Sequence, residues 1–133
     1  MLTSSAAQVR PLRARLLREA FEEDPTLADR VEKLYRSWGV RAAVRAGRGE
    51  DGTPWREQAM VWLEADLQAW ENNLDAGTAK PALARKVLSS LKRDPILKTI
   101  VTGSYMTGLT ARERKRWNVL WARLNRLLKR LAP

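Results

Sequence analysis

Apolar residues recur every three or four positions along most of the chain, which is the spacing of amphipathic helices. In the clearest stretch, Thr53-Pro54 opens a predicted helix over residues 54–75 and Gly77 ends it. The inward positions of this helix are Trp55, Ala59, Trp62, Leu63, Asp66, Leu67, Trp70 and Leu74. Trp62, Asp66 and Trp70 stand four residues apart and therefore share one face. Such a face predicts a packing partner rather than a reaction.

A second stripe of the same period lies near the end of the chain, at Trp117, Leu120, Trp121, Leu124, Leu127, Leu128 and Leu131. Thr110 and Glu113 have the spacing of a capping box, which predicts where this helix begins. Together the stripes predict a core of Trp62, Leu63, Asp66, Leu67, Trp70, Leu88, Leu91, Trp117, Leu120, Trp121, Leu124 and Leu128.

The other segments predict further helices. Residues 1–9 indicate a loose tail, and a helix from about Pro11 carries Leu12, Leu16, Ala20 and Phe21 at helical spacing. Asp24-Pro25 starts a second helix that runs to about residue 46, with a kink or break at Gly39. Residues 48–53 form a linker, a fourth helix opens at Pro81, and Asp94-Pro95 caps a short turn. Since no segment alternates like a strand, we expect an all-α fold of about five helices.

Composition removes several kinds of chemistry. The chain has no histidine and no cysteine, which excludes Ser-His-Asp and Cys-His nucleophiles and zinc sites built on these residues. Gly47, Gly49 and Gly52 spell Gly-x-Gly-x-x-Gly, but nucleotide binding needs a strand before this motif. The helix predicted there favours a flexible linker. We therefore expect no catalytic residue, no cofactor, no metal and no small-molecule substrate.

The acidic residues of the 54–75 segment fall into two groups. Glu57, Glu64 and Glu71 recur every seven residues, which indicates a solvated face or a rim of ion pairs. Asp66 lies on the inward face, where a carboxylate needs a partner. We expect that partner to be an arginine of a neighbouring helix or an indole N–H.

The net charge of +10 is concentrated in the last helix, at Arg112, Arg114, Lys115, Arg116, Arg123, Arg126, Lys129 and Arg130. An acidic partner for this patch would be the 54–75 helix, another chain or phosphate, and a solvated face is the alternative. The tryptophans could stack on bases. Their positions in the apolar stripes favour core packing instead, and only Trp38 and Trp55 are expected to be partly exposed. No apolar run is long enough for a membrane span, no secretion signal is present, and we expect a cytoplasmic protein.

Several segments, in order, resemble one family, the planctomycete-type serine/threonine protein kinases with tetratricopeptide repeats. Residues 15–21 and 24–29 look like the last repeat of these proteins, and residues 62–70 are similar to the Trp-Leu-x-Ala-Asp-Leu-x-x-Trp element that follows it. Asp94-Pro95 matches the Asp-Pro after the next helix. The closing Leu-Pro-x-x-Glu-Arg-x-x-Trp-x-x-Leu-Trp helix resembles residues 109–128, with Arg112, Glu113, Arg114, Trp117, Leu120 and Trp121.

The resemblance covers about residues 10–131. It implies a degenerate tetratricopeptide-like helical pair at 10–47 and a tryptophan-rich antiparallel helical cap at 54–133, packed together as one domain. It further implies a non-catalytic protein-interaction or scaffolding module, with an unidentified protein partner. Any kinase activity would lie in a domain outside this chain, because the His-Arg-Asp and Asp-Phe-Gly motifs are missing. The alternative is a small basic nucleic-acid-binding protein.

Overall fold

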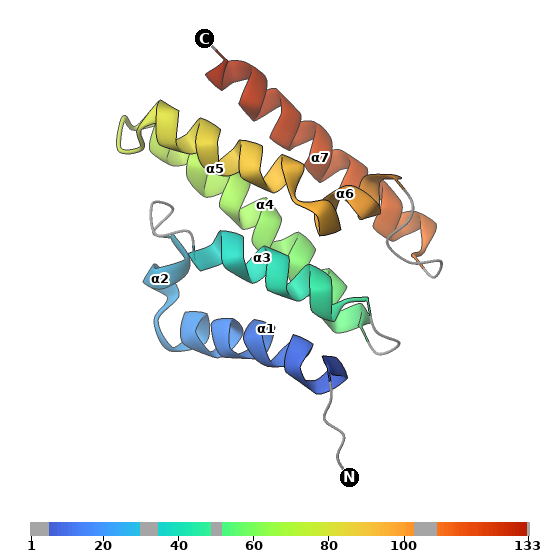
Figure 1. Ribbon diagram of the computed structural model, residues 1–133. Helices are drawn as coiled ribbons and strands as arrows, with labels where there is room; N and C mark the ends of the chain where they lie inside the picture. Colours follow the sequence, from blue (N-terminus) through green and yellow to red (C-terminus); the bar gives the residue numbers. More distant parts are fainter. Residues whose placement is uncertain (1–5, 30–34, 49–51, 103–108, 133) are drawn as a thin grey trace. The chain divides into compact units, whose positions relative to one another are not determined.

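The computed structural model describes residues 6–29, 35–48, 52–102 and 109–132, and these ranges contain seven helices and no strand (Figure 1). The helices are α1 (Ala6–Glu23), α2 (Pro25–Asp29), α3 (Tyr35–Ala46), α4 (Thr53–Asp75), α5 (Pro81–Arg93), α6 (Pro95–Thr102) and α7 (Ala111–Leu131). The predicted all-α class is confirmed. None of the described helices is long and apolar enough to cross a membrane.

Two differences raise the number of helices above the expected five. The second predicted helix is represented by α2 and α3, with residues 30–34 between them outside the described part. The turn expected after Asp94-Pro95 is the eight-residue helix α6, because the Asp94 side chain accepts hydrogen bonds from the N–H groups of Ile96 (2.9 Å) and Leu97 (3.2 Å). At the other end, α1 begins at Ala6, inside the segment expected to be a tail.

The chain divides into two compact units, residues 1–63 and residues 64–133, and the boundary falls within α4. In unit 1, α1 packs along α3, and α2 contacts both helices. Buried residues of this unit include Ala14, Phe21, Val40, Ala43, Val44, Met60, Trp62 and Leu63. Each unit therefore has apolar residues of α4 in its own core.

Gly39 lies inside α3, which continues through it to Ala46, so the helix has no break at this position. The reason for the glycine is the indole of Trp62. A Cβ at Gly39 would stand 3.0 Å from Trp62 Cε3 and 3.4 Å from Phe21 Cε2. The rings of Phe21 and Trp62 also meet edge to face, with centroids 5.4 Å apart. Gly39 therefore lets two aromatic rings approach the backbone of α3.

Gly47, Gly52 and Arg56 hold together the two described ends of the connection between α3 and α4. A Cβ on Gly52 would overlap the backbone of Gly47, so these two residues pack backbone to backbone. Arg56, which is buried, donates from Nη1 to the carbonyl of Gly47 (3.0 Å) and from Nη2 to Thr53 Oγ1 (2.9 Å). Residues 49–51 of the predicted linker lie outside the described part. The described ends of the linker are tied to the first turn of α4.

Unit 2 is built from the second half of α4 with α5, α6 and α7. The last three helices contact one another, and the buried residues include Leu67, Trp70, Ala84, Leu88, Leu91, Leu97, Ile100, Trp117, Leu120 and Leu124. α5 is antiparallel to α4 and α7, whereas α4 and α7 run in the same direction (Figure 1). Successive long helices of unit 2 are therefore antiparallel, while α4 and α7 are parallel to each other (Figure 1).

Both predicted ends of the long helices are confirmed. Gly77 has φ of 75°, its N–H donates to the Leu74 carbonyl (3.2 Å), and the Thr78 N–H donates to the Asn73 carbonyl (2.8 Å). This is a Schellman motif, which favours glycine at the left-handed position. At the start of α7, Thr110 Oγ1 accepts from the Glu113 N–H (3.0 Å) and Glu113 Oε1 accepts from the Thr110 N–H (3.1 Å), forming the capping box.

Candidate functional site

Three arginines of the predicted basic patch pair with acidic residues of α4. We call these pairs the α4–α7 ladder: Arg116 with Glu64 at 4.0 Å, Arg123 with Glu71 at 3.1 Å, and Arg130 with Asp75 at 2.6 Å. Residue numbers rise together on both helices, as expected for helices that run in the same direction. Of the three partners left open by the sequence, the acidic helix therefore accounts for part of the patch.

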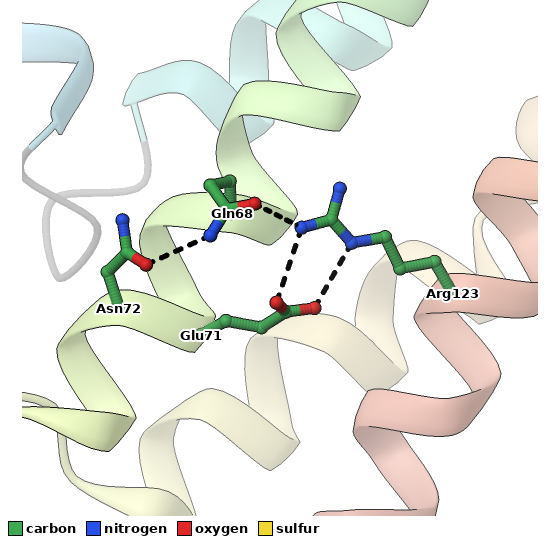
Figure 2. Close-up of polar contacts among 4 residues, drawn as sticks. All are labelled: Gln68, Glu71, Asn72 and Arg123. Atoms are coloured by element: carbon green, nitrogen blue, oxygen red, sulfur yellow. Dashed lines mark hydrogen bonds and ion pairs between the residues drawn. The ribbon is translucent and has the colours of Figure 1, made fainter.

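The centre of the ladder is a hydrogen-bonded network (Figure 2). Arg123 donates from Nε to Glu71 Oε1 (3.1 Å), and from Nη2 to Glu71 Oε2 (3.3 Å) and to Gln68 Oε1 (2.6 Å). Gln68 Nε2 in turn donates to Asn72 Oδ1 (2.9 Å). The planar guanidinium thus engages both carboxylate oxygens, a geometry that a lysine cannot reproduce.

We expect the Arg123–Glu71 pair to contribute about 0.5–1 kcal/mol of coupling free energy to unfolding, because its side chains are only 21% and 29% exposed. The Arg130–Asp75 pair, at 48% and 65% exposed, should contribute about 0.3 kcal/mol or less. Double-mutant cycles to alanine, measured by urea unfolding of the full chain, give both values. Equal coupling in the two pairs would contradict the assignment of the stronger interaction to the network.

The other five patch residues are not part of the α4–α7 ladder. Arg112, Arg114, Lys115, Arg126 and Lys129 are all exposed, and Arg114 donates from Nη1 to the Leu109 carbonyl (2.8 Å). The remaining four follow one another at intervals of three, eleven and three residues, on the exposed side of α7. We call Arg112, Lys115, Arg126 and Lys129 the cationic stripe. The stripe is the candidate site for an anionic partner.

The expected core positions are mostly buried. Exposures are at most 7% for Trp62, Leu63, Asp66, Leu67, Trp70, Leu88, Leu91, Trp117, Leu120 and Leu124. Trp121 and Leu128 are only partly buried, while Leu127 is buried in the same helix. The sequence prediction missed Met60, Leu97 and Ile100, of which the last two follow the helical spacing of α6.

Asp66 is 2% exposed and has an interaction within the structure, as a buried carboxylate requires. The identity of its predicted partner stays a prediction. Among the described residues, no group of three or more His, Cys, Asp or Glu side chains could hold a metal ion. Glu64, Asp66, Glu71 and Asp75 of α4 therefore all have contacts within the structure.

The glycine motif lacks the surroundings that nucleotide binding needs. Helix α3 precedes it where the fingerprint requires a strand. The carbonyl of Gly47 accepts from Arg56, and Gly52 packs against Gly47. Both glycines are explained by the close backbone approach of this connection.

Unit 1 presents apolar side chains to solvent. Leu12 (42% exposed), Leu16 (55%), Trp38 (49%) and Val61 (43%) are all in this unit. Leu12 and Leu16 were read as one stripe with the buried Phe21, but the inward face of α1 instead carries Ala14 and Phe21. Residues 14 and 21 are seven apart and therefore also lie on one helical face. Periodicity alone does not decide between this face and the one that carries the leucines.

The two tryptophans expected to be partly exposed are so. Trp38 is half exposed, and its ring meets Tyr35 edge to face at 5.8 Å. Trp55 is partly buried beneath the guanidinium of Arg18, which lies 4.6 Å from the ring centroid. Trp38 is therefore the most accessible tryptophan among the described residues. Comparison of the chain with family models, with curated proteins and with solved structures found no match.

Proposed function

We propose that this chain is a non-catalytic protein-interaction or scaffolding module that binds its partner through unit 1. The observation that carries the proposal is that four large apolar side chains of unit 1, Leu12, Leu16, Trp38 and Val61, are exposed. Contiguous exposed apolar surface marks interaction sites, and tryptophan is enriched among the residues that dominate binding energy. Leu12 and Leu16 are one helical turn apart and so present a continuous apolar surface on α1.

The resemblance to repeat-containing serine/threonine kinases suggests how the helices would be organised in such a module. α1 with α2 and α3 would form the degenerate tetratricopeptide-like pair, and α4 to α7 the tryptophan-rich cap. Terminal units of helical repeats have an atypical outer face that ends the stack. In such a protein, located in the cytoplasm, this region would supply binding and a separate domain would supply phosphoryl transfer. The absence of histidine and cysteine from the sequence supports a binding role.

Site-specific photo-crosslinking in cells that express the chain tests the proposal. With benzoylphenylalanine at position 16 or 38, we expect one polypeptide to be crosslinked at both positions. Val119, which is 59% exposed and lies in unit 2, is the matched control position and should give no such product. Adding Leu12→Lys should remove the product from position 16, because it places a charge on the same surface. Identical products at positions 16, 38 and 119, or none at 16 and 38, would overturn the proposal.

A further inference from the structure

All carboxylates of unit 2 are already engaged. The sequence from residue 64 to residue 133 contains Glu64, Asp66, Glu71, Asp75, Asp94 and Glu113. Three of these belong to the α4–α7 ladder, Asp66 is buried, and Asp94 and Glu113 cap the starts of α6 and α7. Hence each of these six acidic side chains already has an interaction within the fold.

The exposed cations of unit 2 are much more numerous than its surface carboxylates. Outside the ladder they are Lys80, Arg85, Lys86, Lys92, Arg93, Lys98, Arg112, Arg114, Lys115, Arg126 and Lys129. Like charges in this number repel one another, and a polyanion that binds across them relieves the repulsion and releases its own counterions. The electrostatic surplus of the chain is thus located in unit 2.

The cationic stripe arranges four of these exposed cations along a single helix. Arg112 and Lys129 are seventeen positions apart on one unbroken helix, which is about 25 Å at 1.5 Å per residue. Between them, Val119 and Ala122 are exposed on the same side of α7 and carry no charge. A row of cations of this length matches about seven base pairs of duplex, at 3.4 Å per pair.

We propose that the cationic stripe of α7 binds the phosphate backbone of a nucleic-acid duplex without reading its sequence. Contacts to phosphate require only accessible cations, whereas sequence reading requires side chains that reach base edges. This binding is separate from the proposed function, because the apolar surface lies on unit 1 and the stripe on unit 2.

Two other partners fit the stripe less well. An acidic protein would need apolar or aromatic anchors at the centre of its interface, and Val119 is the only large apolar side chain of unit 2 that is exposed among the described residues. Single-stranded nucleic acid would need aromatic platforms. The described tryptophans of this unit, Trp70, Trp117 and Trp121, are buried or partly buried. A duplex backbone requires neither feature.

Fluorescence anisotropy of a labelled DNA duplex of about 20 base pairs, titrated with the full chain, tests the proposal. We expect a Kd of about 10⁻⁴–10⁻⁶ M near physiological salt, and a weakening of at least about 100-fold between 50 and 200 mM salt if four phosphates are contacted. Replacing the whole stripe with glutamine should weaken binding at 50 mM salt at least about 10-fold. It should also reduce the salt slope by about 3 to 4.

The matched control removes four exposed arginines from unit 1, with the variant Arg13→Gln, Arg15→Gln, Arg45→Gln and Arg48→Gln. It has the same net charge as the stripe variant and should keep most of the affinity. A second variant, with Arg112→Lys and Arg126→Lys, keeps the charges and should bind like the unchanged chain. Circular dichroism melts verify that each variant is folded.

Four results would overturn the proposal. They are absence of duplex binding at 50 mM salt, equal losses in the stripe and control variants, tighter binding to poly-glutamate or single-stranded DNA than to the duplex, and tighter binding to anionic vesicles. The first two would show that the stripe is a solvated face or that net charge alone acts. The last two would assign the stripe to a different class of partner. None of these results bears on the crosslinks expected at positions 16 and 38.

Discussion

Replacing Trp70 with alanine should lower the free energy of unfolding by about 3–5 kcal/mol, the largest effect we expect from a single substitution. The Trp70 side chain is 1% exposed and lies in the part of α4 that belongs to unit 2. Removing the indole forfeits its transfer free energy and leaves a cavity that the surrounding helices fill only in part. Since small domains are stable by about 5–15 kcal/mol, the loss would be a large fraction of the total stability.

Urea unfolding of the full chain, followed by circular dichroism at 222 nm, measures this effect. Trp38→Ala is the matched control, because Trp38 is 49% exposed and its removal should cost about 1 kcal/mol or less. Trp70→Phe keeps part of the buried surface and should fall between the two, so the order can be tested even if the alanine variant is unfolded. A smaller loss at position 70 than at position 38 would contradict the packing described for unit 2.

The second large effect is expected at Gly39. Gly39→Val should lower the free energy of unfolding by about 1–3 kcal/mol, because the added atoms meet the Trp62 ring, which is itself held against Phe21. At an exposed helical position the loss of a glycine would instead stabilise the protein, since glycine is disfavoured in helices by about 1 kcal/mol relative to alanine. The sign of the effect therefore reports on the close approach of the indole.

Repeating the substitution at Gly39 in a Trp62→Phe protein tests whether the effect comes from the contact with the indole ring. In a Trp62→Phe protein the smaller ring leaves room at α3, and Gly39→Ala should then stabilise by about 0.5–1 kcal/mol relative to that background. In the unchanged protein the same Gly39→Ala substitution should gain less or lose stability. The differences in urea midpoint across the four variants give the interaction free energy. A value near zero would show that Gly39 and Trp62 act independently.

The sequence correctly predicted those helices that have a strong apolar periodicity and clear start or end signals. The helix expected at 54–75 is α4 (Thr53–Asp75), and the helix expected to begin at the Thr110 capping box and to carry the stripe up to Leu131 is α7 (Ala111–Leu131). Gly77 and the capping box of Thr110 supplied local signals that do not depend on tertiary contacts. These signals are encoded in a few neighbouring residues, which is why they could be recognised without a structure.

Tertiary contacts could not be predicted in the same way. Local propensity disfavours glycine and so indicates a kink or break at Gly39, whereas the role of this residue depends on a ring more than twenty residues later in the chain. Leu12 and Leu16 follow helical spacing as well as Phe21 does, and only the packing of α1 against α3 decides which residues are buried. The members of the cationic stripe also depend on tertiary contacts. The sequence shows eight cations in the patch, and only the structure separates those paired with α4 from the others.

The repeat within the α4–α7 ladder has a consequence for how the two helices find their alignment. Glu64 and Glu71 are seven residues apart, and so are Arg116, Arg123 and Arg130. Sliding α7 by two helical turns would bring Arg123 opposite Glu64 and Arg130 opposite Glu71, so two of the three charge pairs would survive. Attraction between these charges therefore favours the observed offset over the shifted one by only a single pair. The rest of the selection must come from shape, through large buried side chains such as Trp70 and Trp117.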